Sequence, residues 1–134
     1  MIFFDSGGWI ALSVPNDRNA KVAQGVYGDT ARGAHGRIVT TDFVLDEAAT
    51  FVRMATDVAT AAILLRRVTS APNITVVWID AGHFADAIED FERHEDKRWS
   101  FTDCTSFVVM RDLGIGKAFT FDRNFDQAGF TRLP

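Results

Sequence analysis

The sequence has few of the residues that mark secreted and membrane proteins. Its single cysteine, Cys104, excludes an intrachain disulfide and a zinc site built from several cysteines. It contains no apolar run of the roughly 18 residues that a transmembrane helix requires. The apolar N-terminal stretch has no basic residue ahead of it and is interrupted by Asp5, which is atypical of a signal peptide. We therefore expect a protein of the reducing cytoplasm that does not enter a membrane.

Positive charge is also scarce. The 14 Lys and Arg residues are outnumbered by 18 Asp and Glu residues, which gives a formal net charge of −4. The chain therefore has no overall basic field of the kind that attracts nucleic acids. A polyanion would have to bind a local basic patch or a bound cation.

What the sequence does contain is typical of a globular protein. Its 134 residues are 47% hydrophobic and 24% charged, and no internal repeat divides them. This length is sufficient for one hydrophobic core, so we expect a single domain over residues 1–134.

Short apolar strands alternate with helical patterns along the chain. We expect strands at 2–5, 36–41, 73–80 and 117–122 and near 129–134, and helices at 6–14, 17–33, 42–56, 57–70 and 81–98 and from Ser100 onward. This alternation predicts an α/β fold with a small, mainly parallel β-sheet flanked by helices on both faces. Ligands of such sheets bind at the carboxyl ends of the strands.

Four acidic residues occupy positions where they could meet at this edge. Asp5 and Asp122 each end a predicted strand, whereas Glu47 and Asp103 lie on the apolar sides of predicted helices. Carboxylates that converge without a cation repel one another and raise each other's pKa. Since Mg²⁺ prefers oxygen ligands, the pattern favours a metal site.

Each acid also has a structural interpretation. Asp103 fits a helix-capping box that starts at Ser100, and Asp5 fits a helix N-cap. Asp122 fits a turn, and Glu47 fits the protein surface, with Asp46 facing inward in its place.

The joint order of these segments resembles the PIN domain, and most closely the VapC toxins of toxin–antitoxin pairs. The matching segments are the strand that ends in Asp5-Ser6, "TTDFVLDEAATFV", "SFTDCTSFVVMRDLGI" and "AFTFDRNFDQAGF", which together span nearly the whole chain. The last two segments are the most specific. The resemblance implies a PIN-like fold and an endoribonuclease that depends on Mg²⁺ or Mn²⁺.

The resemblance also assigns roles to residues. It implies that the catalytic and metal-binding acids are Asp5, Glu47, Asp103 and Asp122. It implies that their supporting polar neighbours are Ser6, Thr102 and Asp126. Gly7 departs from the small polar residue of many relatives, which weakens a hydrogen bond but removes no ligand.

Partners follow from the same resemblance. Such toxins are homodimers that act on RNA and are inhibited by a cognate VapB-type antitoxin, whose C-terminal segment covers the acidic site. Trp9 and Ile10 either line the groove for that segment or belong to the core. The candidates for holding RNA phosphates are Arg18, Lys21, Arg53, Lys97, Arg98 and Arg123.

Three other functions compete with this one. A HAD-like phosphotransferase needs a second Asp two residues after the first, where this chain has Gly7. A receiver domain has its acids in a different order. A non-catalytic PIN-like module that binds RNA or protein remains the alternative, and loss of metal-dependent cleavage on Asp→Asn substitution would distinguish the enzyme from it.

Overall fold

The computed structural model describes all of residues 1–134. The elements are β1 (Ile2–Phe4), α1 (Ser6–Ser13), α2 (Ala20–Ala31), β2 (Ile38–Thr41), α3 (Asp42–Ala55), α4 (Val58–Ser70), β3 (Ile74–Val77), α5 (Ala81–Arg93), α6 (Phe101–Asp112), β4 (Lys117–Phe119), α7 (Asn124–Gln127) and β5 (Thr131–Leu133). The expected alternation is confirmed. The short helix α7 was not expected, and two expected strands end early, at Val77 and Phe119.

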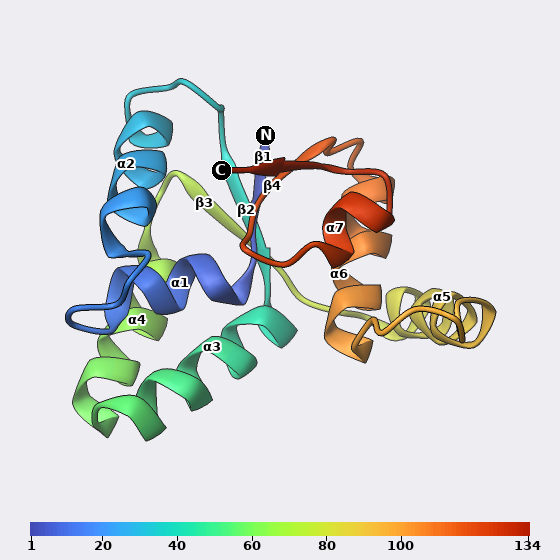
Figure 1. The fold of residues 1–134 in the computed structure, drawn as a ribbon, viewed down its shortest axis with the longest axis horizontal. Helices are drawn as coiled ribbons and strands as arrows, with labels where there is room; N and C mark the ends of the chain where they lie inside the picture. The colour runs from blue at the N-terminus through green and yellow to red at the C-terminus, as the bar shows by residue number, and fades with distance from the viewer.

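The strands form one sheet in the order β3-β2-β1-β4-β5, and every neighbouring pair is parallel. Figure 1 shows α1, α2 and α4 on one side of this sheet and α5, α6 and α7 on the other. Helix α3 begins directly at the end of β2 and packs against both α1 and α6. The predicted α/β class, with a PIN-like sheet between helices, is confirmed, and the sheet is entirely parallel.

The strand order reverses between β1 and β4. The chain builds β1, β2 and β3 outward in one direction and then crosses to β4 and β5 on the other side of β1. Such a switch point leaves a crevice outside the carboxyl ends of the two central strands, where ligands of open α/β sheets bind. Asp5 follows β1 at this point, and Thr120 follows β4.

The core on the α1 side of the sheet is aromatic. The ring of Phe4 lies 5.0 Å from Trp9 and 5.1 Å from Phe119, between ring centroids. The Trp9 indole is buried, and its Nε1 donates a 3.1 Å hydrogen bond to the hydroxyl of Thr40. Trp9 is therefore a core residue, and Ile10 packs half-buried against the same core.

No helix has both the length and the apolar character needed to cross a bilayer.

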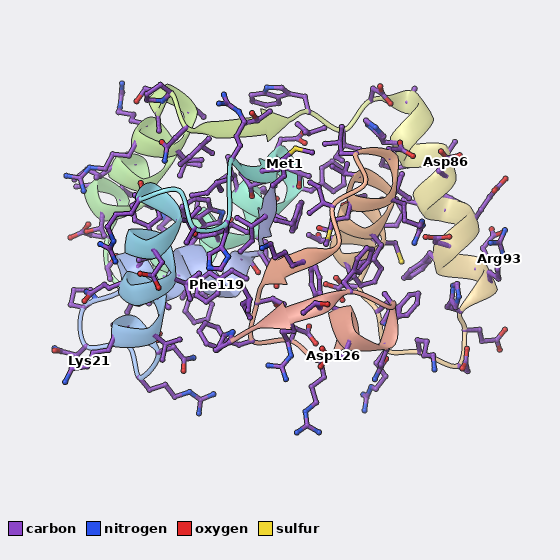
Figure 2. All side chains as sticks on the ribbon, turned by 90° about the horizontal axis from the view of Figure 1, so that it is seen from above. Met1, Lys21, Asp86, Arg93, Phe119 and Asp126 are labelled. Atoms are coloured by element: carbon purple, nitrogen blue, oxygen red, sulfur yellow. The ribbon has the colours of Figure 1, made fainter.

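The start of α1 lies very close to β4. A Cβ placed on Gly8 would come within 2.6 Å of a ring carbon of Phe119, which lies in the middle of the molecule in Figure 2. Only a residue without a side chain allows this approach. The contact fixes the start of α1, and with it Asp5 and Ser6, beside the end of β4.

Candidate active site

The four predicted acids converge at the switch point from four different elements. Asp5 follows β1, Glu47 lies in the second turn of α3, Asp103 lies in the first turn of α6, and Asp122 follows β4. Their charges act on one another, since Asp103 and Glu47 raise the pKa of Asp5, and Asp122 raises that of both Glu47 and Asp103.

The four acids differ in depth. Asp5 and Asp103 are only 6% and 8% exposed, whereas Glu47 and Asp122 lie at the exposed margin of the cluster. Glu47, rather than its exposed neighbour Asp46, is the acid of α3 whose charge acts on Asp5. The cluster therefore has a buried pair and a solvent-facing pair.

Asp103 is both a capping residue and a member of this cluster. Its backbone N–H donates to the Ser100 hydroxyl, and its Oδ2 accepts from the Ser100 N–H, both at 3.0 Å, so the expected capping box is present. Oδ2 also accepts a 3.0 Å hydrogen bond from the side-chain amide of Asn124. No protein donor is bonded to Oδ1, which remains available to a ligand.

Asp122 forms the expected turn and is also tied to Asp5. Its Oδ1 accepts from the Asn124 N–H at 2.8 Å, and its own N–H donates to the Thr120 hydroxyl at 3.0 Å. That hydroxyl donates to Oδ2 of Asp5 at 2.7 Å. Asp5 occupies the N-cap position of α1, as one interpretation expected, but its side chain makes no capping hydrogen bond.

Burial is the main cause of the unusual titration of these acids. It raises the pKa of Asp5 from 3.8 to about 7, and hydrogen bonds from Thr120 and the Ser6 backbone only partly oppose the rise. Burial also raises the pKa of Glu47 and Asp103, with the negative charge of Asp103 adding to the effect on Glu47. Near neutral pH the cluster must therefore hold a proton or attract a cation.

The three expected supporting residues lie in different surroundings. The Ser6 side chain lies beside Glu47 and opposes the rise of its pKa. The Thr102 carbonyl accepts from the hydroxyls of Thr105 and Ser106 within α6. Asp126, labelled on α7 in Figure 2, accepts a 3.0 Å hydrogen bond from Nε of Arg132 and is bonded to none of the four acids.

Two polar residues of the site, Thr120 and Asn124, were not singled out from the sequence. The signal that could have found them is the segment Thr120-Phe-Asp-Arg-Asn124. Residues two apart at the end of a strand share a face, and an Asx turn brings the residue two after Asp122 back to it. Both side chains bond directly to the predicted acids.

The donor chemistry fits a hard divalent cation. All four acids offer oxygen atoms, but no three His, Cys, Asp or Glu side chains lie close enough together to enclose a metal ion. Mg²⁺ is typically bound by one or two carboxylates, with water and substrate phosphate completing the octahedron. A shallow depression of about 510 Å³ leaves room for them, and it is lined by Asp5, Ser6, Gly7, Phe121, Asp122 and Arg123.

Of the six basic residues considered for RNA phosphates, Arg123 alone lines this depression. Lys97 lies 3.5 Å from Asp96, which offsets its charge. Figure 2 shows Lys21 on α2 at one end of the molecule, well away from Asp126 on α7. Of the six, Arg123 is therefore the residue that the structure places at the site.

Comparison with known proteins places the chain in a family. The PIN domain family profile matches residues 2–131. The chain is 33% identical to the 23S rRNA-specific endonuclease VapC20 of Mycobacterium tuberculosis, in strains CDC 1551 and H37Rv, over 99% of this chain and 98% of the relative. The crystal structure of M. tuberculosis VapC20, described as a sarcin–ricin loop cleaving toxin, superposes with a TM-score of 0.88 at 29% identity. That superposition covers 98% of this chain and 97% of VapC20. The chain therefore belongs to the PIN-domain family, among its VapC-type ribonuclease toxins.

Proposed function

We propose that this protein is an endoribonuclease toxin that requires Mg²⁺ or Mn²⁺ and cuts RNA at the cluster of Asp5, Glu47, Asp103 and Asp122. The observation that carries the proposal is the convergence of these four carboxylates at the β1/β4 switch point, with the buried Asp5 at a pKa of about 7. A bound divalent cation removes the cost of keeping Asp5 and its neighbours ionised together. It also lowers the pKa of a coordinated water and offsets charge on the phosphate.

The roles that we propose for the four acids follow from how deeply each is buried. The buried Asp5 and Asp103 hold the cation directly, and Oδ1 of Asp103 is free for this purpose. Glu47 and Asp122 face solvent, so they contact the cation through water molecules or orient the water that attacks the phosphodiester. Arg123, at the rim of the depression, holds a phosphate of the RNA.

The substrate that we propose is a structured loop of ribosomal RNA. VapC20 is specific for 23S rRNA and cleaves the sarcin–ricin loop, and its similarity to this chain extends over the full length of both. A chain with a net charge of −4 cannot rely on general attraction to RNA, so recognition must depend on the local shape of the RNA at the site.

The antitoxin site that we propose is an apolar groove of about 390 Å³ between α1, α2 and α4. Its lining includes Trp9, Leu12, Tyr27, Ile63, Leu64 and Arg67. Helix α1 begins immediately after Asp5, so a VapB-type segment that lies in this groove and follows α1 leads to the acidic cluster. A toxin that is regulated in this way and acts on ribosomal RNA works in the cytoplasm.

We also propose that the protein is a homodimer that pairs through α5. Phe84, Ile88 and Phe91 recur at spacings of four and three along this helix and are 44%, 40% and 49% exposed. Helix α5 packs against α6 and lies at the outer edge of the molecule in Figure 1. An exposed apolar stripe of this kind is typical of a helix that packs against a second copy.

Cleavage of a sarcin–ricin loop RNA by the purified, antitoxin-free protein tests the nuclease. The assay compares Mn²⁺, Mg²⁺ and EDTA, and compares Asp103→Asn with the control Asp112→Asn at the other end of α6. We expect a single metal-dependent cut that Asp103→Asn abolishes and Asp112→Asn retains. RNA binding without fragments under every condition would instead favour the non-catalytic binding module, and cutting in EDTA would exclude the metal-dependent mechanism.

A further inference from the structure

Asn124 joins two of the four acids. It is the first residue of α7, and its side-chain Nδ2 donates to Oδ2 of Asp103 at 3.0 Å and to Oδ2 of Asp122 at 3.3 Å. Its backbone N–H donates to Oδ1 of Asp122 at 2.8 Å. One residue therefore links a carboxylate of α6 to a carboxylate that follows β4.

These bonds fix the orientation of Asp103. Its Oδ2 accepts two hydrogen bonds, one from the N–H of Ser100, the N-cap of α6, and one from the Asn124 amide of α7. The carboxylate plane cannot turn without breaking one of them, so the position of Oδ1 is fixed as well. A carboxylate that is already oriented loses less conformational freedom when it binds a cation.

Asn124 could alternatively serve only to fix α7 against the body of the protein, and the structure provides a comparison. Gln127 ends the same helix, and its Oε1 accepts a 3.1 Å hydrogen bond from the indole Nε1 of Trp99, just before α6. Both side chains tie α7 to the region of α6, but only Asn124 reaches the carboxylates. The two residues therefore separate helix attachment from carboxylate orientation.

We propose that Asn124 is a positioning residue that orients Asp103 and Asp122 for the catalytic cation. The inference rests on the proposed metal-dependent function. It predicts that removal of the amide weakens cation binding itself, in the absence of RNA.

The test is the Mn²⁺ dissociation constant of RNA-free protein, measured by calorimetry and by the electron paramagnetic resonance of free Mn²⁺. The variants are Asn124→Leu, which keeps the volume without the amide, Asn124→Ala, and the control Gln127→Ala. Unfolding in EDTA shows which variants are folded. If Asn124→Leu does not fold, the comparison is made with Asn124→Ala alone. We expect the dissociation constant to rise about 10- to 100-fold in the Asn124 variants, as is typical when a partner of a metal ligand is removed, and to stay unchanged in Gln127→Ala.

Two results would overturn the inference while leaving the proposed function intact. In one, the Asn124 variants bind Mn²⁺ as tightly as the wild type does. In the other, Gln127→Ala weakens binding to the same extent, which would show that attachment of α7 is what matters. Absence of Mn²⁺ binding by the wild type would remove the metal-dependent function, and this inference with it.

Discussion

The hydroxyl of Thr120 donates a 2.7 Å hydrogen bond to Oδ2 of Asp5, a residue 115 positions away in the sequence. The Thr120 hydroxyl oxygen also accepts a 3.0 Å hydrogen bond from the backbone N–H of Asp122. One buried hydroxyl therefore links the end of β1 to the turn after β4, at the point where the strand order reverses. The geometry of the acidic cluster depends on this link as well as on the acids.

We expect Thr120→Val to lower the free energy of unfolding by about 1–3 kcal/mol, because it leaves a buried carboxylate oxygen and the Asp122 N–H without their partner. Val has nearly the shape of Thr, so packing is preserved. Urea unfolding in EDTA measures the change.

The control for this substitution is Thr120→Ser, which keeps the hydroxyl and loses one methyl group. We expect it to retain the hydrogen bond to Asp5 and to cost less stability than Thr120→Val. If the serine variant proved the less stable of the two, packing of the methyl would outweigh the hydrogen bonds, and Thr120 would not hold the site together.

Asp5 makes the metal-free protein less stable as the pH rises. Its pKa is about 7 in the folded protein, against 3.8 for the ordinary group, so between these values the folded state holds a proton that the unfolded chain has lost. The free energy of unfolding therefore falls from about pH 4 to pH 7 on account of this group, and the loss is complete above pH 7. Asp5→Asn removes the effect, and we expect it to be more stable than the wild type by about 2–4 kcal/mol at pH 8 and equal to it at pH 4.

Unfolding of both proteins in EDTA at pH 4, 6 and 8 tests this expectation. Repeating the series with Mn²⁺ adds a second readout, since the cation should stabilise the wild type at pH 8 and not Asp5→Asn. A variant that is less stable than the wild type at pH 8 would mean that the carboxylate is stabilised as an anion in the folded protein.

Much of the fold follows from local patterns. In α3 the apolar residues Val44, Ala48 and Val52 recur at helical spacing and are buried, whereas Phe51 and Ala55, on the same pattern, are exposed. The strand expected to reach Asp80 ends at Val77, because the N–H of Ile79 donates to the Asp42 side chain at 2.8 Å instead of to a neighbouring strand. Such a bond joins distant segments, so no local pattern predicts it. The four residues of α7 are too few to show a helical period.

The topological rule that places strand ends together predicts the positions of Asp5 and Asp122, whereas Glu47 and Asp103 were predicted from their helical spacing and from the resemblance to PIN domains. That rule does not identify which hydroxyl or amide holds each acid in place. Thr120 and Asn124 look like ordinary residues of a strand end and a turn, and their importance arises from contacts with Asp5 and Asp103, which the fold brings to them. For Asp103, helix capping and membership of the acidic cluster are compatible, because the same carboxylate caps α6 and contacts Asn124 at the cluster.

Gly8 provides a test of how α1 positions Asp5. In Gly8→Ala the new Cβ would lie 2.6 Å from one ring carbon of Phe119 and 2.7 Å from another. Phe119 is fully buried between Phe4 and Phe121 and has no room to move. We expect a loss of about 1–3 kcal/mol in the free energy of unfolding, as is typical of overpacking.

Gly25→Ala, in the middle of α2, is the matched control, because nothing lies within 4 Å of its added Cβ. Alanine has a higher helix propensity than glycine, so we expect the free energy of unfolding of this variant to rise by about 0.5–1 kcal/mol. Chemical unfolding of both variants gives the comparison. Equal stability of Gly8→Ala and the wild type would show that α1 can move away from β4, and that Asp5 is not held by this contact.

The proposed dimer can be tested with two equally simple substitutions on different faces. Ile88 on α5 and Ile63 on α4 are 40% and 49% exposed, so replacing either by Glu adds a charge at the surface without burying it. At an interface between two copies, however, Ile88→Glu would place a charge from each copy in a desolvated apolar contact, which costs several kcal/mol. We expect light scattering after size exclusion to give a dimer for the wild type and Ile63→Glu, and a folded monomer for Ile88→Glu. A dimer that survives Ile88→Glu and is lost in Ile63→Glu would place the interface on the α1–α4 groove instead, and the antitoxin would then have to bind elsewhere.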